Sequence, residues 1–355
     1  MKQKIQSLIR QPFFIRLMHW EYWPFGVVYT PIYLVFMWLG IKARSFFFFA
    51  ASNPTIKNGG FLMETKISID PLIPPPYKPL TLYFDIGTCH TIILQKLKAY
   101  GLDFPLIVKP DMGARGRGVK KVNDEAELQA VLPLYTVPFI VQPFIPFPKE
   151  IGLFYVRMPN EAKGKITGIV RKEFLQVTGD GSSTILQLLQ QNERYVLQIP
   201  ILKKILKDQL PTVLPAGQTE ILLPYGNHAR GCMFIDDSHL VNERLEEVID
   251  DVCRQINGFY FGRLDIRFNT WEELAEGKNF SIIELNGAGS EPTHIYDPKH
   301  SIFFAWKEIV RHLYLLYKVS IINRGKGHSY LSLKEGLQMF SDNAAYDVKL
   351  NALVV

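Results

Sequence analysis

The sequence contains few of the residues that hold small extracellular domains together. Its three cysteines, Cys89, Cys232 and Cys253, are far apart and form no CxxC pair. A disulfide framework or a structural zinc site is therefore not expected, and a reducing cytoplasmic setting is the default prediction. No small-residue cleavage site follows the apolar N-terminal stretch, which is therefore not predicted to be a cleaved signal peptide.

The charge of the chain argues against one class of ligand and leaves several others open. The net charge is +6, yet no run of five or more lysines and arginines occurs, so nucleic-acid binding is not expected. The modest excess suits phosphates, an anionic lipid surface or an acidic substrate, and does not choose between them. With 355 residues and 47% apolar residues, the chain is expected to fold into one large lobe or into two to three modest ones.

The N-terminal 60 residues are strongly aromatic and apolar. Twenty uncharged residues lie between Glu21 and Lys42, and a phenylalanine run, Phe46–Phe49, follows. The length fits a membrane span, but Pro24 and Pro31 count against one uninterrupted helix.

Basic residues precede this stretch, namely Lys2, Lys4, Arg10 and Arg16. Mixed with phenylalanine and tryptophan, they are typical of a segment that lies on a bilayer. We expect peripheral membrane contact through residues 1–60; a buried aromatic core and a true span are the alternatives.

The rest of the chain alternates between short strands and helices without a strict βαβ order. The expected strands cover residues 80–84, 104–109, 139–142, 151–158, 165–171, 261–268 and 280–285. The expected helices cover a short segment from residue 64 and residues 88–100, 124–132, 183–191, 245–257, 303–317 and 331–340. Strands 151–158 and 165–171 are expected to form a hairpin. The pattern predicts an α+β fold with antiparallel sheets.

A first motif combines a lysine with a glycine-rich loop. Lys109 ends the strand FPLIVKP, and the loop GARGRGV follows with Gly113, Gly116 and Gly118. Glycines allow backbone N–H groups to approach phosphate oxygens, and the lysine adds a fixed cation. The order differs from a Walker loop, because no GK[ST] follows. A glycine-rich hairpin that carries surface arginines is the alternative.

A second motif places acidic groups on two neighbouring strands. Side chains alternate along GRLDIRF, so Arg263, Asp265 and Arg267 share one face, and Glu284 and Asn286 share one face of SIIELN. If the strands are neighbours, hard oxygen ligands converge beside arginines, which suits Mg²⁺ held together with phosphates. A salt-bridged sheet surface is the alternative.

Four motifs resemble those of the ATP-grasp superfamily in their order and spacing. They are FPLIVKP with GARGRGV, VQPF with a following Glu, GRLDI, and IIELN. These segments are most similar to D-alanine–D-alanine ligases, and VTGDGSSTILQLLQQN resembles cyanophycin synthetases. The resemblance covers about residues 64–298 and implies two α+β lobes that grip ATP.

The resemblance also implies residue roles. The nucleotide-binding residues that it implies are Lys66, Lys109, Gly113, Arg115, Gly116, Arg117, Gly118, Gln142, Phe144, Glu150 and Lys172. Within that set, Gln142 and Phe144 belong to the hinge that reads adenine, and Glu150 matches the residue that holds the ribose. The metal ligands are Asp265, Glu284 and Asn286, for two Mg²⁺ ions, with Mn²⁺ as an alternative ion. Arg263 and Lys172 match the catalytic cations, and Arg263 would stabilise the tetrahedral intermediate.

The implied activity is an ADP-forming carboxylate–amine ligase that proceeds through an acyl phosphate. The expected substrates are small-molecule or lipid-linked carboxylates and amines. An ATP-grasp kinase acting on a hydroxyl and a non-enzymatic nucleotide-sensing membrane adaptor are the alternatives.

This sequence departs from D-alanine–D-alanine ligase in two places. About sixty aromatic residues replace the domain that helps bind the first amino acid, and NGAGSEPTHIYDP replaces the usual Pro-Gly after the metal-binding Asn. The second change introduces Glu291, His294 and Asp297, whose roles stay open, as do the substrate and the oligomeric state.

Four regions are expected along the chain. They are the aromatic segment 1–60, a linker lobe 61–105, the nucleotide-binding and catalytic lobes 106–300, and a helical tail 301–355. The protein is expected in the cytoplasm, with the inner face of the membrane as the place of peripheral contact.

Overall fold

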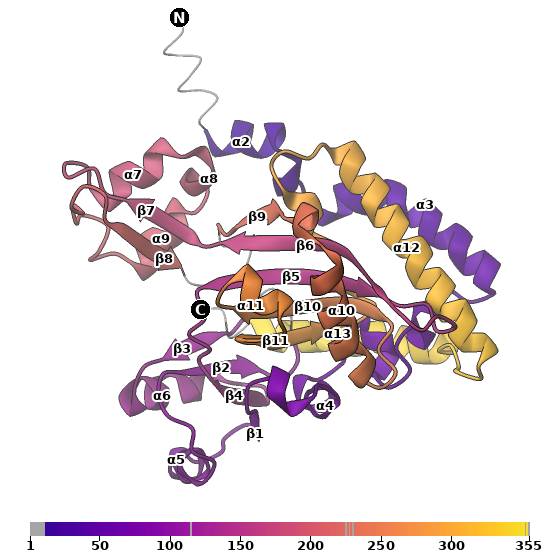
Figure 1. Ribbon diagram of the computed structural model, residues 1–355. Coiled ribbons are helices and arrows are strands. Elements are labelled where there is room, and N and C mark those ends of the chain that lie inside the picture. The colour runs from indigo at the N-terminus through magenta and orange to yellow at the C-terminus, as the bar shows by residue number, and fades with distance from the viewer. Residues whose placement is uncertain are drawn as a thin grey trace, which may run out of the picture.

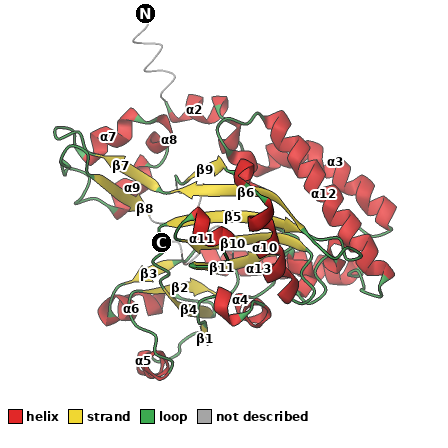
Figure 2. Cartoon of the chain, in the orientation of Figure 1, coloured by secondary structure: helices red, strands yellow, loops and turns green. Residues whose placement is uncertain are grey.

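The computed structural model describes residues 11–113, 116–223, 226, 228, 231–351 and 353 (Figure 1). Arg115, Lys2, Lys4 and Arg10 lie outside the described residues. Strands occupy the middle of the molecule and helices lie mostly on its outside (Figure 2). All paired strands run antiparallel, so the expected α+β fold with antiparallel sheets is confirmed.

The smaller lobe is a four-stranded sheet in the order β1-β4-β2-β3. Its strands are β1 (Leu82–Phe84), β2 (Leu106–Pro110), β3 (Lys120–Val122) and β4 (Phe139–Pro143). Its helices are α5 (His90–Ala99) and α6 (Glu125–Val131), whereas the short helix α4 (Lys66–Ile69) places Ile69 in the core of the larger lobe. Leu106, Val108 and Val141 are buried with apolar residues of α5 and α6, so this lobe has its own core.

The larger lobe is a five-stranded sheet in the order β11-β10-β5-β6-β9. Its strands are β5 (Lys149–Val156), β6 (Lys165–Glu173), β9 (Met233–Asp236), β10 (Phe261–Phe268) and β11 (Phe280–Asn286), and its helices are α10 (Glu243–Gln255) and α11 (Trp271–Ala275). The expected β5–β6 hairpin is confirmed. Leu264, Ile266 and Phe268 share a core with buried residues of α10, which leaves the alternate residues of β10 on the opposite face.

A small unit extends from β6. It contains β7 (Leu175–Thr178), β8 (Thr219–Leu223), α7 (Ile185–Gln191), α8 (Glu193–Val196) and α9 (Ile199–Ile205). Among its elements, only α7 was expected from the sequence. Strands β7 and β8 pair although forty residues separate them in the sequence. Pairing between such distant segments has no signature in the local sequence, so neither strand was expected.

The remaining described helices of more than one turn are α2 (Pro12–Met18), α3 (Phe25–Ala43), α12 (Ile302–Gly325) and α13 (Leu333–Asn351). Helices α3 and α12 run side by side (Figure 1). Short 3₁₀ turns complete the structure: η1 (Trp20–Tyr22), η2 (Phe48–Ala51), η3 (Lys57–Gly60), η4 (Asp70–Leu72), η5 (Pro75–Tyr77), η6 (Leu132–Leu134), η8 (Ser238–Leu240) and η9 (Thr293–Tyr296).

The expectation that prolines interrupt a helix in the uncharged stretch holds for Pro24, where the helix begins, and is wrong for Pro31. Pro24 is the N-cap of α3, and Pro31 lies inside the helix, which continues to Ala43. Pro31 is exposed, so its ring occupies the solvent side of the helix. Packing of the other side, through Val28 and Ile32, offsets the lost backbone hydrogen bond.

Candidate nucleotide and metal site

Asp265 is the centre of a charged cluster on the polar face of the larger sheet. Arg263 Nε donates to Asp265 Oδ1 at 2.8 Å, and Lys172 Nζ donates to Asp265 Oδ2 at 3.0 Å. Lys172 also donates to Glu150 Oε1 at 2.9 Å, while Arg267 Nε donates to Glu150 Oε2 at 3.2 Å. Side chains from β5, β6 and β10 thus form one continuous network, and the predicted common face of Arg263, Asp265 and Arg267 is confirmed.

The cluster keeps its members ionised although they are buried. Burial alone would raise the pKa of Asp265, but Arg263 and Lys172 outweigh it and lower that pKa to about 2. Burial likewise opposes the charge of Lys172, yet Asp265 and Glu150 raise its pKa above the usual value. The site therefore holds fixed charges in a place from which water is largely excluded.

Glu284 lies directly across from Asp265 in the β10–β11 pairing. Lys66, from the start of α4, forms an ion pair with Glu284 Oε1 at 3.0 Å. Burial opposes ionisation of Glu284, but Lys66 and Lys109 lower its pKa below the usual value. Strands β10 and β11 and helix α4 therefore meet at this carboxylate.

Lys109 enters the same cleft from the end of β2. Its ammonium donates to the carbonyl of Ile283 at 3.0 Å, at the point where a register shift makes β11 bulge. Burial, the largest influence, lowers the pKa of Lys109 to about 8, although Glu284 acts in the opposite direction. Lys109 and Lys66 line a narrow cleft between the lobes together with Gln142 and Glu284.

The residues predicted to hold a metal fit a hard divalent cation. Asn286 pairs with Arg263 in the sheet register, and its buried Nδ2 has no hydrogen-bond partner. Two ionised carboxylates and an amide oxygen are the donor types that Mg²⁺ takes together with phosphates and water. Within the described part of the chain, no three His, Cys, Asp or Glu side chains gather as a complete metal cage. The phosphates would therefore have to supply the rest of the coordination.

The glycine-rich loop is held by the C-terminal helix. Gly116 and Gly118 have φ of 66° and 69°, a conformation that favours glycine. Arg117 donates to Asp347 at 2.7 Å and to Asn351 at 3.0 Å, and a side chain at Gly113 would collide with Leu350. Because Arg117 is engaged by α13, the predicted phosphate contact requires it to exchange partners.

Residues 87–177 match the ATP-grasp domain. This region is an ATP-grasp domain. It contains Lys109, the glycine-rich loop, Glu150 and Lys172. The matched residues do not include Asp265, Glu284 and Asn286, which lie on β10 and β11 of the five-stranded sheet that also carries Glu150 and Lys172.

Several solved structures are similar to the chain, but weakly. D-alanine–D-alanine ligase from Bacillus anthracis is 14% identical at a TM-score of 0.42, over 74% of this chain and 69% of that one. VanG D-Ala:D-Ser ligase from Enterococcus faecalis is 16% identical at 0.39, over 71% and 61%. A bifunctional glutathione synthetase from Pasteurella multocida is 14% identical at 0.37, over 68% of this chain.

This chain spans 36% of the glutathione synthetase and 61% of the D-Ala:D-Ser ligase. No curated protein matched the sequence.

The predicted adenine hinge of the ATP-grasp domain joins the two lobes. Gln142 is buried at the end of β4 and donates to Thr81 at 2.7 Å. The Phe144 ring contacts both Lys121 and Arg267, whose cationic groups are 4.3 Å and 5.1 Å from its centroid. Glu150 already accepts hydrogen bonds from two cations, Lys172 and Arg267. Its predicted contact with the ribose therefore requires one of these hydrogen bonds to break.

Sequence reasoning missed several residues that shape the site. Gly152 pairs with Asp265, and a side chain there would meet Arg263 and the Asp265 carboxylate. A side chain at Gly226 would collide with Glu150 and Lys172. Neither glycine belongs to a motif, so only the cross-strand and loop contacts reveal them.

The loop after β11 places its three polar residues differently. Glu291 lies at the site: its backbone carbonyl accepts from Arg263 at 3.5 Å, and its carboxylate accepts from Tyr29 and Tyr296. His294 is 4% exposed and contacts Glu308 of α12 at 3.3 Å. Asp297 accepts from the backbone of Asp236. His294 and Asp297 therefore anchor the loop, and Glu291 reaches the charged cluster through its backbone carbonyl.

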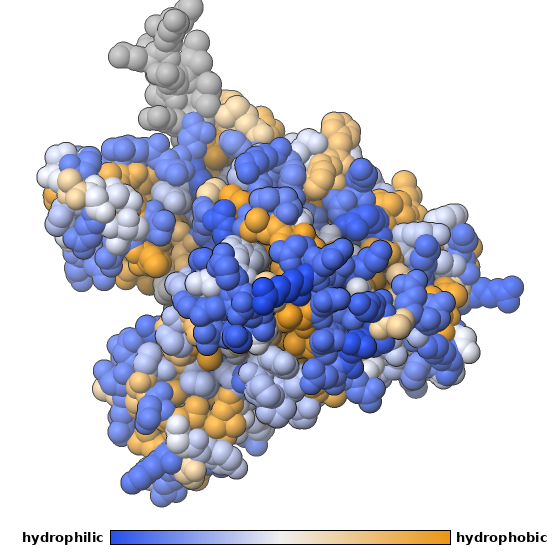
Figure 3. Space-filling model, viewed as in Figure 1, coloured by the Kyte–Doolittle hydropathy of each residue, from blue (hydrophilic) through white to orange (hydrophobic). Residues whose placement is uncertain are grey.

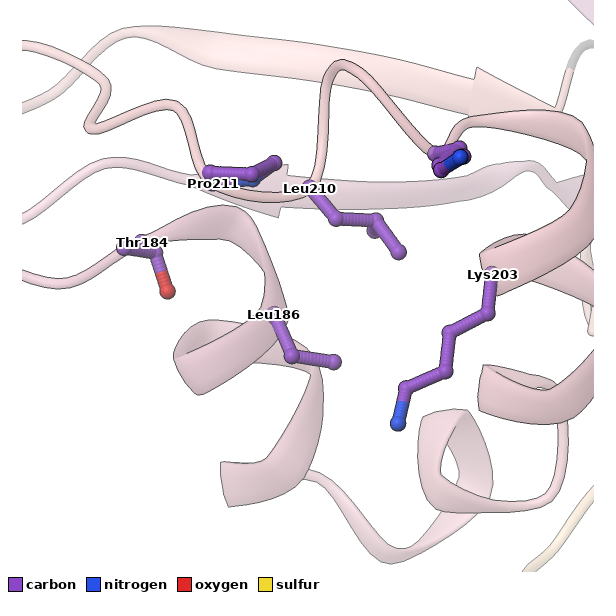
Figure 4. A pocket seen from close by; sticks show the side chains of 6 residues that line it. Thr184, Leu186, Lys203, Leu210 and Pro211 are labelled. Carbon is purple, nitrogen blue, oxygen red and sulfur yellow. The ribbon is translucent and has the colours of Figure 1, made fainter.

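A separate hollow of about 490 Å³ lies in the small unit, between α7 and α9 (Figure 4). Leu186, Leu210 and Lys203 line it, and no carboxylate is among its lining residues. It lacks the acidic groups that the chemistry requires, so the cleft at Asp265 and Glu284 is the candidate site.

Proposed function

We propose that the protein is an ADP-forming, ATP-dependent carboxylate–amine ligase. The observation that carries this proposal is the buried cluster in which Arg263 and Lys172 hold Asp265 opposite Glu284, beside an ATP-grasp domain. Fixed cations and ionised carboxylates in one cleft suit transfer of a phosphoryl group, which needs positioning and charge compensation more than covalent catalysis.

Each group has a defined task in this reaction. Lys66, Lys109 and Lys172 would bind the nucleotide phosphates, and the three metal-ligand candidates would hold two Mg²⁺ ions. Bound Mg²⁺ supplies charge neutralisation at the phosphates. The substrate carboxylate takes the γ-phosphoryl group of ATP, which releases ADP, and an amine then displaces phosphate to form the amide. Arg263 would stabilise the oxyanion of that second step.

The two substrates are proposed by class. They are a carboxylate and an amine, at least one of them lipid-linked or envelope-derived, because the N-terminal segment next to the cleft exposes apolar side chains such as Leu34 and Ile41. Tyr29 of that segment donates to Glu291 beside Arg263, so α3 contributes to the substrate side of the cleft. We place the enzyme in the cytoplasm, at the inner face of the membrane.

The test uses hydroxylamine as the amine and a panel of carboxylates of increasing apolar length. An ATP-dependent hydroxamate that accumulates with ADP and phosphate is the expected result, because hydroxylamine intercepts an acyl phosphate. Glu284→Gln is the negative control. AMP with pyrophosphate would place the protein among adenylating enzymes, and a stable phosphorylated product that hydroxylamine does not trap would make it a kinase.

A further inference from the structure

Helix α3 leaves one side apolar and uncovered. Val27, Leu34, Met37, Trp38 and Ile41 recur at helical spacing and are exposed, with Leu34 at 75% and Ile41 at 66%. The exposed side carries no charge until Lys42. Apolar area of this extent is unusual on a protein that has no partner for it.

The other side of α3 is already used by the fold. Val28 and Ile32 pack with Ala305 and Ile309 of α12, and Trp306 Nε1 donates to the Val28 carbonyl at 2.8 Å. By length and composition α3 is the one described helix that could cross a membrane, with 22% of its apolar stretch buried. Because one side is held by the protein, α3 lies along the surface of the molecule.

Neighbouring helices extend the apolar area. Phe13, Leu17 and Met18 of α2 are exposed, as are Phe303 and Tyr314 of α12. Hydrophobic side chains interrupt the polar surface along the edge where α2, α3 and α12 lie (Figure 3). We call the exposed apolar residues of these three helices the α3 face.

The exposed charges on the chain segments that carry α2, α3 and α12 are of one sign, and Glu193 of α8, 3.9 Å from His19, is an acidic neighbour of these segments. In the described residues 11–60 and 298–328, every exposed charged side chain is basic: Arg16, Lys42, Arg44, Lys57, Lys299, Lys307, Arg311, Lys318, Arg324 and Lys326. The two acidic residues in these ranges, Glu21 and Glu308, have side chains that are 6% and 10% exposed and paired with arginines.

Two of the lysines lie over aromatic rings of the face. Lys42 Nζ is 4.5 Å from the Trp38 ring centroid, and Lys318 Nζ is 4.7 Å from that of Tyr314. This pairing of an apolar body with a cationic tip is suited to the boundary between acyl chains and headgroups.

We propose that the α3 face docks on an anionic lipid bilayer, with α3 lying in the interface. A two-fold pairing with a second copy would bring the same basic rim against itself, which costs electrostatic energy. An anionic bilayer instead satisfies both the apolar stripe and the basic rim. If the proposed ligase function holds, Tyr29 places the reaction centre close to that interface.

The test measures flotation of the full-length protein with vesicles of phosphatidylcholine alone or with roughly a third phosphatidylglycerol. Leu34→Glu/Ile41→Glu places two charges on the apolar stripe. Ile205→Glu is the matched control, because Ile205 is an exposed isoleucine of α9, outside the face. Lys307→Gln/Lys318→Gln removes two rim charges.

Wild type and Ile205→Glu are expected to float with anionic vesicles. The Leu34/Ile41 variant should lose at least roughly tenfold in vesicle partition, and the lysine variant should lose its preference for anionic vesicles. ATP binding should be equal in all four proteins, which separates this proposal from the ligase activity. Absence of flotation, equal flotation of the Leu34/Ile41 variant, or a wild-type dimer that this variant dissociates would overturn the proposal.

Discussion

Lys109 has a backbone carbonyl as its hydrogen-bond acceptor, and its pKa of about 8 follows from burial. Glu284, Asp265 and Asp70 favour its charged form, while Lys66 disfavours it. Bound phosphates would raise this pKa, so ATP binding takes up a proton above pH 8. ATP affinity should therefore fall as pH rises, by up to about tenfold between pH 7 and pH 9.

Titration calorimetry across this range tests the assignment. Lys109→Arg keeps the charge at both pH values, so its profile should be flat, and Lys109→Met should be flat and weaker. A decline that persists unchanged in Lys109→Met would assign the proton to another group.

Neutralising each of the two carboxylates of the site is expected to lower the free energy of unfolding by a different amount. If the proposed function and metal site hold, Glu284→Gln and Asp265→Asn should each abolish ligase turnover, because both remove a proposed metal ligand. Asp265→Asn also leaves Arg263 and Lys172 without their shared partner, so its free energy of unfolding should fall by about 3–5 kcal/mol. Glu284→Gln, whose side chain is 29% exposed, should lose much less.

Turnover and thermal unfolding are measured together on the same preparations. Glu276→Gln is the control, since Glu276 pairs with exposed lysine and arginine side chains away from the cluster. Near wild-type turnover in either site variant would refute the metal-site assignment.

At the scale of elements, α13 restrains the glycine-rich loop. Arg117 and Asp347 form a partly exposed ion pair, and Tyr346 donates to the Met112 carbonyl. Pairs of this exposure contribute about 0.2–1 kcal/mol. Asp347→Asn should therefore speed amide exchange of residues 116–119 by roughly two- to fivefold.

Hydrogen exchange followed by mass spectrometry measures this change. Asp342→Asn is the control, because Asp342 lies on the same helix and accepts a hydrogen bond from Gln338 at 2.8 Å. Equal exchange of the loop in both variants would mean that α13 does not restrain it.

The whole molecule depends on its N-terminal segment. Leu39, Phe48 and Phe49 are at most 1% exposed and share a core with Phe154 of β5 and Phe261 of β10. Each such side chain stabilises the fold by about 1.5–3 kcal/mol, which together is comparable to the whole stability of a domain. A chain that begins at Phe61 should therefore fail to fold.

Circular dichroism and soluble yield of the shortened chain check this prediction. Full-length Leu34→Glu, altered on the exposed side of the same segment, should keep the wild-type melting temperature. A soluble, cooperatively folded short chain would show that residues 1–60 are not part of the core.

Much of the site could be read from the sequence because strand side chains alternate with a period of two. That periodicity placed Asp265 with Arg263 and Arg267, and Glu284 with Asn286, and the β10–β11 register confirms it. The order of motifs also predicted the ATP-grasp domain that residues 87–177 match. Local pattern sufficed in both cases.

Other features were decided by contacts between distant parts of the chain. β10 pairs with β5 as well as β11, which brings Glu150 and Lys172 to Asp265, and α13 reaches the glycine-rich loop across more than two hundred residues. Pro31 continues a helix because α12 packs against its other side. The sequence by itself determined which residues are candidates for the chemistry and which strand faces they share. Only the tertiary structure decided their partners, because burial and long-range pairing have no local signature.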